Sequence, residues 1–136
     1  MDYLKAFTAG FISTLVFHQG AMAVLYTADL WAKQPYDMKA TAPFHLPAVI
    51  SLALWGGLWG IALWLTMRDA PGLSYWATAL LLGALGPTIV ALFVVFPLKG
   101  MPLAAGWDQK IIFGALVLNG AWGLGVALLM RLLARI

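Results

Sequence analysis

Four long stretches of the chain contain no Asp, Glu, Lys or Arg, and short segments with charges, glycines and prolines separate them. The stretches cover residues 6–28, 40–67, 70–98 and 111–130. A helix needs about 20 apolar residues to cross roughly 30 Å of hydrocarbon, because each residue adds about 1.5 Å. The pattern therefore predicts an all-α membrane protein, a bundle of four transmembrane helices with spans at about 6–28, 46–67, 73–96 and 111–133.

The composition agrees with this pattern. Hydrophobic residues make up 63% of the 136 residues and charged residues 10%, whereas soluble domains are about 45–50% apolar and about 25% charged. Because the four spans use nearly the whole chain, we expect one transmembrane domain over residues 1–136. Lys5 precedes the first stretch and the small residues Ala21 and Ala23 follow, but we expect this stretch to stay in the protein as a helix.

Several kinds of chemistry find no support in the sequence. The chain has no cysteine, which excludes disulfide exchange and thiolate metal sites. No Asp or Glu lies inside a predicted span, and there is no phosphate-binding glycine loop, His-Glu-x-x-His motif or Ser/His/Asp set. We therefore expect no enzyme activity, no metal and no cofactor. The net charge of +3 divides between two membrane faces, so the expected partner is the lipid bilayer and not a nucleic acid.

The three connections differ in length. Residues 29–45 contain two prolines and three aromatic residues suited to the headgroup region, which predicts an interfacial loop. Residues 68–72 end in Pro71-Gly72 and predict a tight turn. Residues 97–110 again carry two prolines and form a connection of intermediate length.

An internal similarity links the second and fourth spans. Residues 54–68 and 118–131 align with one gap, which places Trp59-Gly60 on Trp122-Gly123 and Met67-Arg68 on Met130-Arg131. One interpretation is that two helical hairpins derive from one unit and form a parallel repeat. The alternative is chance, because Leu, Gly, Ala and Trp are common in membrane helices.

The distribution of basic residues gives a weak topology signal. With four spans both termini share a face, and each face has four basic residues: Lys5, Arg68, Arg131 and Arg135 on the terminal side, and Lys33, Lys39, Lys99 and Lys110 on the other. The short turn and the arginines favour cytoplasmic termini. Insertion in both orientations stays open, because the two counts are equal.

Small residues form stripes along the second and fourth spans. They allow close approach of helix backbones. The resulting van der Waals packing drives helix association in lipid, where the hydrophobic effect does not act between helices. One interpretation is packing within a single bundle, and the other is a surface for self-association. The predicted packing residues are Gly56, Gly57, Gly60, Gly120 and Gly123.

Polar side chains gather near the predicted middle of the membrane. The set consists of Thr14, His18, Gln19, Thr88 and Asn119. Because unpaired polar groups are costly in hydrocarbon, these side chains should face inward and bond one another. They form either a hydrogen-bonded core or a polar path for a solute or ligand.

Two finer expectations concern this set. Pro87 cannot donate to the carbonyl of Gly83, so Gln19 or Asn119 is expected to bond that oxygen. His18 is interpreted as a hydrogen-bonded core residue, with Asn119 or Thr88 as partner, and less readily as a haem or quinone ligand.

Two short motifs, Leu15-Val16-Phe17-His18-Gln19-Gly20 and Trp55-Gly56-Gly57-Leu58-Trp59-Gly60, resemble those of small bacterial inner-membrane proteins with four spans. The resemblance covers the rest of the chain through hydropathy alone. It implies a bacterial inner-membrane location and carries no activity.

Rich packing motifs and few reactive groups favour a small accessory or structural subunit that assembles with itself, as a homo-oligomer, or with a larger membrane complex. The alternative is a channel or uniporter for a small solute, with the mid-membrane polar residues lining its path.

Overall fold

The computed structural model describes all 136 residues and is built almost entirely from helices. The first span, Asp2–Thr27, consists of α1 (Asp2–Ser13), the π-helical segment η1 (Thr14–His18) and α2 (Gln19–Thr27). The second span is α3 (Ala48–Met67). The third span, Gly72–Leu98, consists of α4 (Gly72–Val90), the π-helical η2 (Ala91–Val95) and α5 (Phe96–Leu98). The fourth span is α6 (Gln109–Leu133).

These four helices are long and apolar enough to cross a membrane, and they pack as a bundle, which confirms the predicted fold class. The first span begins at Asp2 and not near residue 6, because the acidic residue stands in the first turn, where the helix dipole favours a negative charge. The fourth span begins after Asp108, whose side chain accepts a hydrogen bond from the Lys110 backbone at 2.9 Å.

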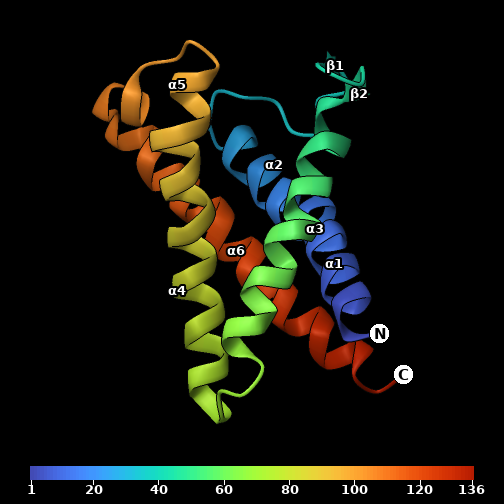
Figure 1. Ribbon diagram of the computed structural model, residues 1–136. Helices are drawn as coiled ribbons and strands as arrows, with labels where there is room; N and C mark the ends of the chain where they lie inside the picture. Colours follow the sequence, from blue (N-terminus) through green and yellow to red (C-terminus); the bar gives the residue numbers. More distant parts are fainter.

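The long loop after the first span contains a small two-stranded element. Strands β1 (Ala40–Thr41) and β2 (Leu46–Pro47) pair antiparallel just before α3. The connection after the third span contains η3 (Leu103–Trp107), whose residues Ala104 to Gly106 have left-handed backbone angles. Both elements lie at the end of the bundle opposite to the termini (Figure 1).

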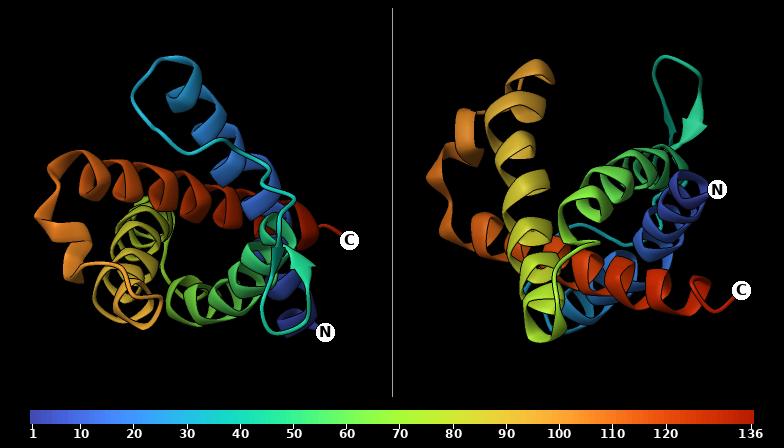
Figure 2. Two further views of the ribbon diagram at one scale, coloured as in Figure 1. Left: turned by 90° about the horizontal axis from the view of Figure 1, so that it is seen from above. Right: turned by 60° about the horizontal axis from the view of Figure 1, so that its bottom comes forward.

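The bundle consists of two helical hairpins. The most extensive contacts join α1 to α3 and α4 to α6, and α6 also packs along α1. In Figure 1 α3 and α4 come together at their lower ends, where the short turn joins them, and the upper ends of the second and third spans stand apart. The view from above in Figure 2 shows the same separation.

Both hairpins are held by a close backbone contact of the same kind. A Cβ atom added at Gly60 would lie 2.6 Å from the Ala6 carbonyl oxygen and 2.8 Å from the Cα of Gly10. In the second hairpin a Cβ at Gly123 would overlap the Ala79 carbonyl oxygen and lie 3.0 Å from the Cα of Gly83.

These equivalent contacts support the interpretation that the chain is an internal repeat. Each pair of partners has the same spacing, since Ala6 and Gly10 are separated as Ala79 and Gly83 are. The first and third spans also each contain a π-helical segment, η1 and η2, in the half further from the termini. The two aligned glycines therefore occupy corresponding places in the two halves.

Local causes accompany both π segments. In the first span the Thr14 hydroxyl donates to the Gly10 carbonyl at 2.9 Å, a bond that bends helices. In the third span Pro87 lies one turn before η2 and removes one hydrogen bond from α4. Each helix therefore changes its winding at a residue that disturbs the regular backbone ladder.

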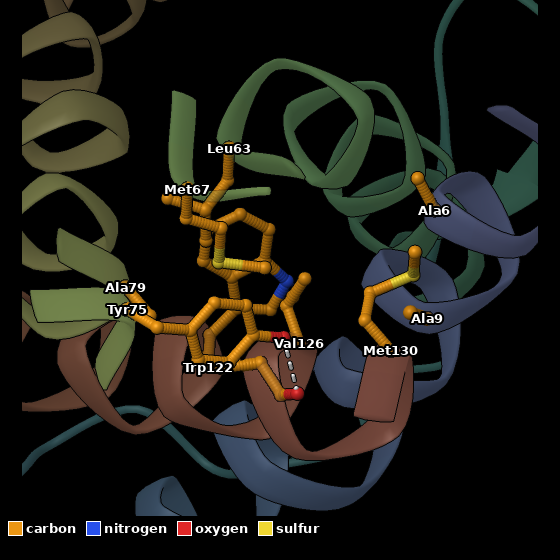
Figure 3. Close-up of a cluster of buried hydrophobic side chains, with 10 residues drawn as sticks. Ala6, Ala9, Leu63, Met67, Tyr75, Ala79, Trp122, Val126 and Met130 are labelled. Carbon is orange, nitrogen blue, oxygen red and sulfur yellow. Dashed lines mark hydrogen bonds between the residues drawn. The ribbon is translucent and has the colours of Figure 1, made fainter. Parts of the chain in front are cut away.

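The core lies in the terminal half of the bundle. Figure 3 shows its buried side chains, which come from all four spans. Trp122 fills the space between α6 and α1, and the Tyr75 hydroxyl donates to the Ala127 carbonyl at 2.8 Å, the dashed line in the figure. The cluster comprises Ala6, Ala9, Leu63, Met67, Tyr75, Ala79, Trp122, Val126, Ala127 and Met130.

Candidate functional site

The predicted polar set is divided among separate parts of the bundle. Thr14 bonds only within its own helix, to the Gly10 carbonyl, and its hydroxyl lies where a Cβ at Gly56 would be. Thr88 and Asn119 form a pair, and His18 and Gln19 form another. The five side chains therefore do not make one polar path along the bundle.

His18 and Gln19 are tied to the loop that follows the first span. The side-chain nitrogen of Gln19 is 3.1 Å from Nδ1 of His18, and its oxygen accepts from the Tyr36 backbone at 2.7 Å. The Tyr36 hydroxyl donates to the Leu15 carbonyl at 2.7 Å. Gln19 is 3% exposed, so the loop closes over the groups it bonds. The expectation that Asn119 or Thr88 would be the partner of His18 is wrong, because Gln19 is adjacent and already in range.

Thr88 and Asn119 join the third and fourth spans. The Asn119 amide donates to the Thr88 hydroxyl at 2.8 Å, and Thr88 donates to the Ala115 carbonyl at 3.4 Å. The Gly83 carbonyl, which Pro87 leaves without its helical donor, receives no bond from Gln19 or from Asn119. The sequence interpretation failed here because both amides are used by nearer partners.

The predicted packing glycines face neighbouring helices of the same chain. A Cβ built at Gly56 would contact Thr14 and Gly10 of the first span. One at Gly60 would contact Ala6 and Gly10, and one at Gly57 would contact the ring of Phe7. Gly123 meets α4 backbone, whereas Gly120 has looser contact with Leu80 and Ala84 side chains. The stripes are thus occupied within one bundle.

One central contact was not singled out from the sequence. The indole nitrogen of Trp122 donates to the Gly10 carbonyl at 3.1 Å, and the Ser13 hydroxyl donates to the Trp122 carbonyl at 2.6 Å. Gly10 therefore accepts from both Thr14 and Trp122. The only available signal was the alignment of Trp122 with Trp59, which gives no partner on another span.

A second missed feature is a hollow of about 350 Å³ at the terminal end, named here the basic hollow. Three of its lining residues are cations from three different segments, and two are aromatic. The spacing of Trp64 and Arg68 by four residues could have indicated part of it. The lining consists of Asp2, Lys5, Trp64, Arg68, Ala70, Tyr75, Met130, Arg131 and Ala134.

Comparison with family models, curated proteins and solved structures found no match to this chain. The geometry therefore carries the functional argument. The chain is a small multi-pass membrane protein with four candidate spans and an apolar surface that contacts the bilayer.

Proposed function

We propose that this protein is a small integral membrane subunit without an enzymatic step of its own, which assembles with itself or with a larger membrane complex. The observation that carries this proposal is the state of its interior. The buried polar side chains Ser13, Thr14, Gln19 and Thr88 all have hydrogen-bond partners inside the chain. Satisfied polar groups of this kind fix the register of helices, which supports a structural role for these four side chains.

The packing of the hairpins weighs against the alternative of a solute channel within one chain. Backbone contacts at Gly60 and Gly123 close the space between the paired helices. The large indole of Trp122, which is 3% exposed, occupies the interface between the first and fourth spans. A solute would have to displace these contacts, because the terminal half of the bundle is filled by side chains.

The surface of the chain supports assembly. Its accessible area is 8086 Å², whereas a compact monomer of the same mass is expected to have about 6,900 Å². The upper ends of the second and third spans stand apart (Figures 1 and 2), so the bundle is open there. An open bundle of this shape presents more apolar surface than four closely packed helices need to leave uncovered.

The size of the purified particle tests this proposal. Light scattering or native mass spectrometry of the protein in mild detergent should give either a defined multiple of one chain or one chain with a stoichiometric foreign subunit. Both outcomes agree with an assembling subunit, and they distinguish its two forms. A strictly monomeric particle that also runs as a monomer after reconstitution into lipid would contradict the proposal.

We further propose that the protein resides in a bacterial inner membrane with both termini in the cytoplasm. The two termini lie at one end of the bundle (Figure 1). Arg68 follows the end of α3, Arg131 lies in the last turn of α6, and Arg135 follows α6. Short arginine-bearing segments favour the cytoplasmic side, and the two motifs that resemble bacterial inner-membrane proteins support the location.

A periplasm-active reporter fused to Ile136 should give no signal, and a cytoplasm-active reporter should be active. Strong periplasmic activity would reverse the orientation, and activity of both would indicate dual insertion.

A further inference from the structure

The basic hollow brings together three cations that are far apart in the sequence. Lys5 comes from the first span, Arg68 follows the second and Arg131 belongs to the last turn of the fourth. The only acidic residue of the lining is Asp2. No carboxylate lies within 4.0 Å of the Lys5 or Arg131 charges, since the one ion pair of the chain joins Arg68 to Asp69.

Arg131 is held in place by aromatic rings. Its guanidinium carbon lies 4.4 Å from the centre of the Tyr75 ring and 5.9 Å from that of Trp76. Tyr75 is itself fixed, because its hydroxyl donates to the Ala127 carbonyl. Cation–π contact does not itself use the N–H donors of the guanidinium, of which there are five.

The two other cations differ in what they contact. The guanidinium of Arg68 lies 5.1 Å from the centre of the Trp64 ring, and its ion pair with Asp69 is 3.4 Å long and exposed to solvent at both ends. Exposed pairs of this kind are weak, so an anion can compete for Arg68. Lys5 donates to the Leu133 carbonyl at 3.0 Å and keeps further donors of its ammonium group.

We propose that the basic hollow binds a phosphate group. Arginine forks match the oxygens of phosphate with two parallel hydrogen bonds, and lysine adds a point charge. The hollow lies at the ends of the spans, where the headgroups of the bilayer are found. Its remaining walls include Trp64 and Met130, which suit the glycerol and upper acyl region of a lipid. A phospholipid of the terminal-side leaflet and free inorganic phosphate are the two sources of the group.

Native mass spectrometry of the protein with equal amounts of phosphatidylglycerol and phosphatidylcholine tests the site. The unaltered protein should retain the anionic lipid preferentially. Arg131→Gln should lower that preference about tenfold, the effect expected for the loss of a charge-assisted hydrogen bond. Asp2→Asn should raise it, since it removes the one negative charge of the lining.

Arg135→Gln is the matched control, because Arg135 carries the same charge one turn further along the chain and does not line the hollow. It should keep the lipid preference. If Arg131→Gln does not fold, Arg68→Gln takes its place, since Arg68 is at the exposed rim. The proposal would be overturned if Arg131→Gln and Asp2→Asn showed the same lipid preference as the unaltered protein. It would also be overturned if Arg135→Gln lost as much of that preference as Arg131→Gln.

Inorganic phosphate distinguishes the two sources. Thermal unfolding in phosphate and in chloride at matched ionic strength should show no phosphate-specific stabilisation if the site takes the phosphate of a lipid only. Stabilisation that Arg131→Gln abolishes would identify free phosphate as a ligand of the same hollow. Absence of both lipid preference and phosphate stabilisation contradicts a phosphate site.

Discussion

Replacing Trp122 with alanine is expected to lower the free energy of unfolding by about 3 kcal/mol, near the lower end of the range for buried tryptophan. The indole is 3% exposed and packs in the core of the terminal half. Its removal leaves a cavity between the fourth and first spans and a Gly10 carbonyl with one donor fewer. The value is at the lower end because lipid or detergent also surrounds an exposed indole in the unfolded state.

Two further variants separate packing from hydrogen bonding. Trp122→Phe keeps most of the apolar volume and loses the bond to Gly10, so it should cost about 1 kcal/mol. Trp55→Ala is the matched control, because Trp55 lies on α3 and is 62% exposed. The free energy of unfolding of all three variants can be measured in a denaturing detergent, with circular dichroism as the signal. Equal losses for Trp122→Ala and Trp55→Ala would show that the indole of Trp122 is not a core contact.

The spans were predictable because one physical quantity sets them. Hydrocarbon thickness requires about 20 uncharged residues, and the chain places its charges between such stretches. The second span was expected at about 46–67 and is Ala48–Met67. The predicted and observed spans differ only at their ends. The first and fourth helices begin earlier than hydropathy alone indicates, because Asp2 and Asp108 favour the start of a helix.

The hydrogen-bond partners were not predictable from the same pattern. A polar residue inside a span must be paired, but hydropathy does not say with what. Gln19 bonds Tyr36, a residue of the connecting loop, because the loop folds back over the first span. Thr14 bonds its own helix, as threonine hydroxyls do when the Gly10 carbonyl one turn earlier is within reach.

The basic hollow required the pairing of the helices to be known. Lys5, Arg68 and Arg131 appear in the sequence as ordinary cations at helix ends, where they also act as interfacial anchors. Their convergence follows from the fact that the first, second and fourth spans meet at the terminal end. The contact of Arg131 with Tyr75 joins the fourth span to the third, and hydropathy does not indicate which residues of paired helices touch.

Gly60→Ala is expected to destabilise the bundle by about 2 to 3 kcal/mol, within the range for overpacked cores. Its new Cβ would lie 2.6 Å from the Ala6 carbonyl oxygen and 2.8 Å from the Gly10 Cα, and helix backbone cannot move aside as a flexible side chain does. Gly57→Ala should cost less, because the atoms nearest to a Cβ there belong to the ring of Phe7, a side chain that can shift more easily than backbone. Gly123→Ala should match Gly60→Ala, since its Cβ would overlap Ala79 backbone.

Gly20→Ala is the control for these three variants, since a Cβ at Gly20 has no atom within 4 Å. Alanine favours the helix by about 0.5 to 1 kcal/mol over glycine, so Gly20→Ala should leave the unfolding midpoint unchanged or raise it. A loss for Gly60→Ala no greater than that for Gly20→Ala would mean that the first and second spans are further apart than described. A loss at Gly60 without one at Gly123 would remove the equivalence of the two hairpins, because that equivalence requires both backbone contacts to be tight.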